Sequence, residues 1–103
     1  RQIVAEAGRQ TSIARSPEDA AAILASVAAR VGAAAEPLCA AYLRAGCGLS
    51  VALDPDLAVR AALDGAQVRV SLGMMRLLAN EDEMAAVVGH EYGHHIAEHL
   101  SRR

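Results

Sequence analysis

The sequence contains no phenylalanine, no tryptophan and no lysine, and its only tyrosines are Tyr42 and Tyr92. A core without large aromatic rings must be built from Leu, Val, Ile and Met, with alanine letting helices approach one another closely. Hydrophobic residues still make up 53% of the 103 residues, and the formal net charge is only −2. Disordered chains have fewer apolar residues and more net charge. We therefore expect residues 1–103 to form one helix-rich domain, or part of one.

A clustered basic face is also missing, which argues against nucleic acid as a partner. The nearest approach to a long apolar run, residues 20–29, is much shorter than the roughly 18 residues that a membrane helix needs. We therefore expect no membrane span. The chain does not begin with Met and shows no signal-peptide pattern at Arg1. We expect both ends to be boundaries within a longer protein.

Cysteine is limited to Cys39 and Cys47, eight positions apart. This spacing is not the Cys-x-x-Cys pair of a zinc knuckle or a thioredoxin motif. Two interpretations remain open at this point. The cysteines are either two small buried hydrophobic residues or a local disulfide between a helix and the loop after it, which would indicate an oxidising compartment.

Helix signals dominate the first half of the chain. Residues 1–15 have no clean hydrophobic period and are expected to form a loose N-terminal arm. Ser16-Pro17-Glu18-Asp19 combines a cap, a proline suited to the first helical position and two acids at the positive end of the helix dipole. The helix that begins there is expected to be interrupted at Glu36-Pro37, and a second helix is expected over residues 38–44.

Strand signals are confined to the middle of the chain. Residues 49–53 and 67–72 alternate between apolar and polar side chains, and the two strands are expected to pair in a small sheet. Asp64-Gly65 predicts a turn, and residues 74–79 predict a short helix. Together with the helical patterns on either side, these strands predict an α+β fold.

The last predicted helix contains the candidate metal-binding and catalytic residues. Asn80 caps it, and Glu83 stands where it completes a capping box. His90 and His94 are four residues apart, so they project from one face of the helix. Two imidazoles at this spacing can bind one tetrahedral Zn²⁺. Glu91 lies about 100° further round the helix and is placed to act as a general base on a metal-bound water.

The segment His90-Glu91-Tyr92-Gly93-His94 is the known five-residue signature of metallopeptidases. The alternative is a solvated helix face with incidental histidines. Gly89 and Gly93 each cost about 0.5–1 kcal/mol relative to alanine, so we expect another element to pack closely against them. His95 and His99 project in other directions, so we expect the third zinc ligand to lie outside this helix.

Three segments of the chain together are more specific than the five-residue motif alone. Residues 61–65 follow Arg60 and lead into a turn, residues 68–75 form a strand and a turn, and residues 80–94 with His99 form the last helix. In these segments the sequence resembles the HtpX-like gluzincin zinc metallopeptidases, which include the CAAX prenyl proteases and the Oma-type peptidases. Arg60 stands where that family usually has Asn.

The resemblance implies a zinc endopeptidase that hydrolyses misfolded or extended protein substrates, with His90 and His94 as zinc ligands and Glu91 as the base. It implies that the strand over residues 67–72 is the edge along which a peptide pairs. The family takes its third ligand from a Glu on a later helix, which this chain does not reach. We therefore expect this chain alone to bind zinc weakly and to cleave little.

Residues 38–47 are similar to the exported branch of that family. This implies a periplasmic or otherwise exported protein in which Cys39 is bonded to Cys47, with a cytoplasmic or membrane-associated location as the alternative. A different class of function also remains open, namely a non-catalytic domain that binds proteins like a chaperone. The intact Glu91 argues against it. A metal hydrolase other than a peptidase is a further alternative.

Overall fold

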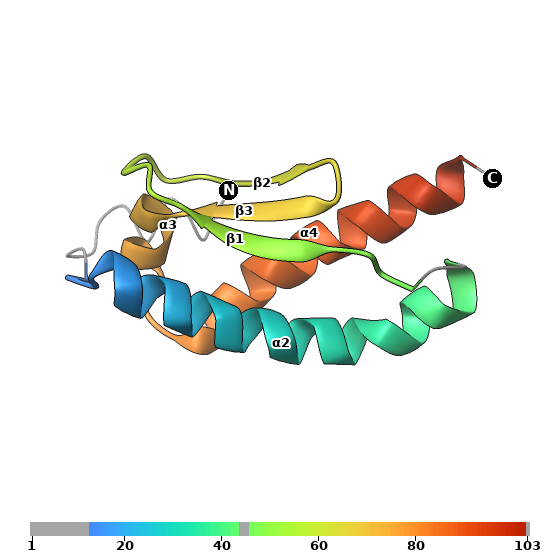
Figure 1. Ribbon diagram of the computed structural model, residues 1–103, viewed down its shortest axis with the longest axis horizontal. Coiled ribbons are helices and arrows are strands. Elements are labelled where there is room, and N and C mark those ends of the chain that lie inside the picture. Colours follow the sequence, from blue (N-terminus) through green and yellow to red (C-terminus); the bar gives the residue numbers. More distant parts are fainter. Residues whose placement is uncertain (1–12, 44–45, 103) are drawn as a thin grey trace.

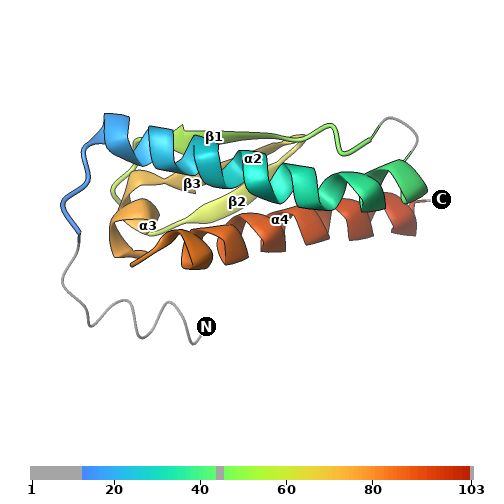
Figure 2. The same ribbon diagram turned by 90° about the horizontal axis from the view of Figure 1, so that it is seen from below.

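The computed structural model describes residues 13–43 and 46–102. Its elements are α2 (Pro17–Tyr42), β1 (Ser50–Asp54), β2 (Ala61–Asp64), β3 (Gln67–Ser71), α3 (Leu72–Leu77) and α4 (Glu81–Ser101). The three strands form one layer, and α2 and α4 lie side by side as the second layer (Figures 1 and 2). The predicted α+β fold is confirmed.

Helix α2 begins as the sequence predicts, because the Ser16 hydroxyl accepts a hydrogen bond of 3.0 Å from the Asp19 N–H. Its predicted interruption is wrong, since the helix continues through Pro37 to Tyr42. A proline inside a helix removes one hydrogen bond and favours a kink, and α2 bends towards this end (Figure 1). The turn after Pro37 is held by Cys39, which is buried and bonded to Cys47.

By length and composition, α2 is apolar enough to cross a membrane. This differs from our expectation, which rested on the longest uninterrupted apolar run and gave too little weight to alanine on both sides of Arg30. Core helices of soluble proteins and signal sequences meet the same criteria. In this fold Ala20, Leu24 and Val27 are buried and α2 packs against β1 and α4, but only 17% of its apolar stretch is buried.

The sheet has the strand order β1–β3–β2, with β3 parallel to β1 and antiparallel to β2. The two predicted strands therefore pair as expected. Strand β2 was not predicted, because residues 61–64 were expected only to lead into the turn at Asp64-Gly65. That turn is one residue later, where Gly65 has a φ of +62° and connects β2 to β3, a backbone conformation that favours glycine.

The position of β3 corrects a second expectation. Residues 67–72 were expected to supply the free edge of the sheet, but β3 is hydrogen-bonded on both sides. The free edges belong to β1 and β2. Pairing with β2 on one side uses the backbone groups that a peptide would otherwise bind.

The core is aliphatic and rich in methionine, as the composition predicts. The largest buried side chains come from α2, β3, α3 and α4, and from the residue that ends α3: Val27, Val68, Val70, Met75, Leu78, Met84 and Val88. Two polar side chains, Ser71 and His95, are buried with them. Each must find a hydrogen-bond partner, because an unpaired polar group costs free energy in the core.

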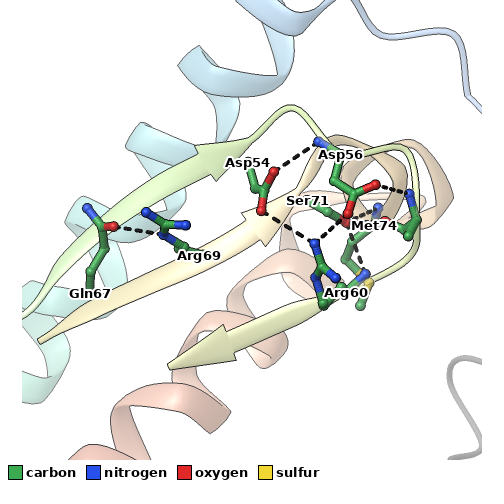
Figure 3. A network of polar contacts seen from close by, with 8 residues as sticks. Asp54, Asp56, Arg60, Gln67, Arg69, Ser71 and Met74 are labelled. Atoms are coloured by element: carbon green, nitrogen blue, oxygen red, sulfur yellow. Dashed lines mark hydrogen bonds and ion pairs between the residues drawn. The ribbon is translucent and has the colours of Figure 1, made fainter. Parts of the chain in front are cut away.

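Ser71 meets this need at the junction of β3 and α3 (Figure 3). Its hydroxyl accepts hydrogen bonds of 3.0 Å from the Met74 and Arg60 N–H groups and donates one of 2.6 Å to the Ala58 carbonyl. One side chain thus caps α3 and ties down the connection between β1 and β2. Gly73 completes the junction, because a side chain there would overlap the Leu57 carbonyl.

The same connection carries a small charge cluster on its solvent side. The Arg60 guanidinium forms ion pairs with Asp56 and, at 3.6 Å, with Asp54. The Ala58 N–H donates to the Asp56 carboxylate, and this bond together with Arg60 lowers the pKa of Asp56. Arg60, which replaces the Asn usual in the resembled family, is therefore engaged within its own loop.

Only the end of the predicted N-terminal arm lies within the described residues, and residues 1–12 lie outside them. The Ile13 N–H donates to the Arg76 carbonyl at 2.7 Å. The Arg15 guanidinium donates to the Met75 and Leu78 carbonyls, the latter at 2.8 Å. Residues 13–15 thus satisfy carbonyl groups at the end of α3.

Candidate metal centre

The start of α4 sets the register of the histidines that follow. The Asn80 side chain accepts a hydrogen bond of 2.9 Å from the Glu83 N–H, as a helix cap does. The Glu83 carboxylate accepts one of 2.8 Å from the Ala79 N–H, one residue before the cap. The predicted capping box is therefore present in a form shifted by one residue, and α4 runs unbroken to Ser101.

His90 and His94 lie together on the solvent side of α4. Their Nε2 atoms are 3.0 Å apart, their rings are perpendicular, and both side chains are exposed. Two nitrogen atoms bound to one tetrahedral zinc at about 2.0–2.1 Å are separated by about 3.3–3.4 Å. The two Nε2 atoms therefore need only a small movement to reach the spacing of two zinc ligands.

Glu91 lies between these histidines in sequence and is half-buried. No hydrogen bond or ion pair holds its carboxylate among the residues that the structure describes. Both oxygens are thus available as acceptors. A general base needs this, because its lone pair must receive the proton.

A third protein ligand is not found near the two histidines. Within residues 13–43 and 46–102, no group of three or more His, Cys, Asp or Glu side chains is arranged to hold a metal ion. The two imidazoles suit zinc in donor type and spacing, but supply only two of its four tetrahedral positions. The residues present therefore fit half of a zinc site.

The expectation for the two glycines of this helix is wrong. A Cβ atom at Gly89 or at Gly93 would meet no atom within 4 Å among the described residues. The close approach to α4 occurs instead at Gly32 of α2, where a Cβ atom would lie 3.2 Å from the Tyr92 hydroxyl. Tyr92 is about 160–200° round the helix from the two histidines, so α2 covers the opposite side of α4.

His95 has a place that sequence reasoning did not find. It is only 4% exposed, and its Nε2 donates a hydrogen bond of 2.8 Å to the Cys47 carbonyl. His99 donates from Nδ1 to the His95 carbonyl at 3.0 Å. The signal was available, since His95 follows Val88 by seven positions and Tyr92 by three, which places it on the buried face.

A cleft of about 800 Å³ opens beside this end of α4. It is bounded by the end of α2, the disulfide loop, the turn between β2 and β3, and the last turns of α4. The wall on this side is formed by His95, Glu98 and His99 of α4 and by Arg102, which caps that helix. Glu98 is one turn beyond His94 and about 40° round from it, so the cleft adjoins the face that carries the histidine pair.

Comparison with known proteins gives a family match. Residues 57–103 match the model of Peptidase family M48. The matched part begins in the connection before β2 and includes β2, β3, α3 and α4, while α2 and β1 lie outside it. No curated protein and no solved structure matches the chain. The family resemblance seen in the sequence is confirmed over these residues.

Proposed function

We propose that this chain, which matches the model of Peptidase family M48 over residues 57–103, is part of a zinc-dependent endopeptidase. In this proposal His90 and His94 bind the metal and Glu91 is the general base. The observation that carries it is the 3.0 Å separation of the His90 and His94 Nε2 atoms. It occurs on the exposed side of a helix within the matched segment.

In this proposal the metal ligands and the general base have separate roles in peptide hydrolysis. Zinc, when bound, polarises the scissile carbonyl and lowers the pKa of water. Glu91 takes a proton on its carboxylate from the attacking water and passes it to the nitrogen of the leaving amine. Its half-burial and its lack of a partner among the described residues keep the carboxylate free for both transfers.

The free edge of β2 is the proposed binding site for an extended peptide. The Ser71 N–H donates to the Arg60 carbonyl at 2.9 Å, so Arg60 faces β3. Hydrogen-bonded and non-hydrogen-bonded pairs alternate along antiparallel strands, so the backbone groups of Ala61 and Leu63 point outwards. A substrate strand can pair with them.

We favour β2 over the other free edge because of its neighbours. Helix α4, which carries the histidine pair, packs against β2, whereas β1 packs against α2. A peptide along β2 thus lies on the side of the sheet nearest His90 and His94. This arrangement fits unfolded or extended protein segments as the substrate class.

The zinc site is tested by competition with a chromogenic chelator, using the whole chain. His90→Ala and His94→Ala should each weaken zinc binding at least about tenfold, because each removes one of few ligands. His99→Ala is the matched control, since this histidine lies on the same helix and makes no contact with the pair. Unchanged zinc affinity in both ligand variants would exclude the site.

Catalysis is tested separately by cleavage of casein. With two protein ligands this chain should cleave little, and a longer form that adds a carboxylate ligand should cleave well. Glu91→Gln in the longer form should abolish cleavage while leaving zinc affinity nearly unchanged. Full cleavage by Glu91→Gln would remove Glu91 from the proposal.

The second candidate is a non-catalytic protein-binding module. It is favoured by the missing third ligand among the described residues. Its outcome in the same assays is distinct: casein binds to the chain and to the longer form, zinc has no effect on that binding, and neither protein cleaves.

We also propose that the protein is exported. The bond between Cys39 and Cys47 supports this, because such bonds persist in oxidising compartments. Thiol labelling of the protein, extracted from its own cells under acid quenching without reductant, should find both cysteines protected. Complete labelling would favour a reducing, cytoplasmic location.

A further inference from the structure

The His95 side chain makes a single hydrogen bond among the described residues. Its Nε2 donates to the Cys47 carbonyl at 2.8 Å, and its Nδ1 is buried without a partner among the described residues. If the carbonyl moved away, both ring nitrogens would be unpaired in the core. Such a loss is costly, so the ring would leave the core or the helix around it would open.

The Cys47 carbonyl is itself held firmly in place. Cys47 belongs to the loop between α2 and β1, and its bond to the fully buried Cys39 brings the two Cα atoms to 4.9 Å. Gly46 and Gly48 on either side have φ angles of +76° and +63°. Only glycine adopts this conformation readily, so the direction of the carbonyl depends on the disulfide and on both glycines.

His95 also follows His94 directly in α4. A rotation or a local opening of α4 at this point would displace the His94 ring from His90, because both rings depend on one helical register. The hydrogen bond to the disulfide loop opposes such a movement. It does so without touching the proposed metal position.

We propose that the Cys39–Cys47 disulfide supports the metal-binding end of α4 through the hydrogen bond between His95 and the Cys47 carbonyl. His95 is thus a positioning residue for His94. The support of the helix stands on the geometry alone, and its effect on metal binding rests on the function proposed above.

The first test uses amide hydrogen exchange on the whole metal-free chain. His95→Leu and the double variant Cys39→Ser/Cys47→Ser should each speed exchange over residues 94–101 by about fivefold or more, while residues 84–90 change little, because opening is local. His95→Gln keeps an N–H that reaches the carbonyl and should remain close to the parent protein. Ala97→Ser, an exposed change within the same stretch of α4, is the control.

The second test measures zinc affinity. His95→Leu should weaken it about tenfold, the lower end of the loss found when groups that orient a metal ligand are removed, because the His94 ring is then less firmly placed. The Cys39→Ser/Cys47→Ser variant should weaken zinc affinity by a similar factor. The triple variant His95→Leu/Cys39→Ser/Cys47→Ser should bind zinc no more weakly than either, because both changes remove the same interaction. His95→Gln should restore most of the affinity.

Additive losses in the triple variant, or unchanged exchange over residues 94–101 in both variants, would overturn the proposal. If His90→Ala and His94→Ala leave zinc affinity unchanged, the metal site fails and the exchange data alone decide the role of His95. Circular dichroism checks that each variant folds. Should His95→Leu not fold, His95→Asn replaces it, because that shorter amide ends short of the Cys47 carbonyl.

Discussion

Tyr92 of α4 faces Gly32 of α2, and a methyl group at residue 32 would stand 3.2 Å from the Tyr92 hydroxyl oxygen. Burial raises the pKa of the Tyr92 phenol above its usual 10.0, and the nearby Glu36 carboxylate raises it further. Ionising Tyr92 is therefore harder in the folded chain than in the unfolded one.

This difference predicts an alkaline loss of stability. The neutral phenol stabilises the fold fully below the unfolded pKa of 10.0, and that contribution is lost as pH rises through the higher folded pKa. Urea unfolding between about pH 8 and about pH 11 should show the free energy of unfolding falling above pH 10. Tyr92→Phe should flatten this fall and the exposed Tyr42→Phe should not. An equal fall in both variants would contradict the assignment.

The glycines predict opposite effects of adding one methyl group. Gly93→Ala should raise the free energy of unfolding by about 0.5–1 kcal/mol, because the site is helical and open. Gly73→Ala should lower it by several kcal/mol, since the methyl group would overlap the Leu57 carbonyl. Urea unfolding measures both. A destabilised Gly93→Ala would mean that another element does pack there.

Ser71 predicts an unusually large effect for a serine. Ser71→Ala should lower the free energy of unfolding by about 2–4 kcal/mol, because it removes a helix cap and leaves the part-buried Ala58 carbonyl and two N–H groups with fewer partners. Ser50→Ala is the matched control, as Ser50 is exposed on β1. Thermal and urea unfolding should agree on the difference, and equal stability of the two variants would show that Ser71 is not a structural centre.

The disulfide is expected to contribute measurably to the free energy of unfolding through the entropy of the unfolded chain. Closing a loop of eight residues lowers the entropy of the unfolded chain and should stabilise the fold by about 2–3 kcal/mol. Cys39→Ser/Cys47→Ser should lose this amount in urea unfolding at neutral pH. Ala40→Ser, an exposed change in the same turn of α2, is the control. No loss in the double variant would indicate that the bond does not constrain the unfolded chain.

Local features of the chain were readable from the sequence because their causes are local. Ser16 and Asn80 cap the helices that follow them, since each side chain reaches an N–H three residues ahead. The alternation over residues 67–72 identified β3, and the four-residue spacing of His90 and His94 is enough to place two rings on one helix face. The family match over residues 57–103 includes both β3 and the two histidines.

Other features were decided only by contacts between distant segments. Pro37 lies inside α2, and the turn after it is joined through Cys39 to a loop beyond the helix, a link that helix propensities do not report. The central position of β3 depends on β2, a four-residue strand whose weak local signal is outweighed by its pairing. The role of His95 depends on a carbonyl 48 positions away. The sequence by itself determined where the candidate metal ligands His90 and His94 lie on their helix, because side-chain type and helical spacing are local properties. Only the tertiary structure decided that His95 is buried and hydrogen-bonded to the Cys47 carbonyl, because burial and hydrogen bonding across the core depend on residues far apart in the sequence.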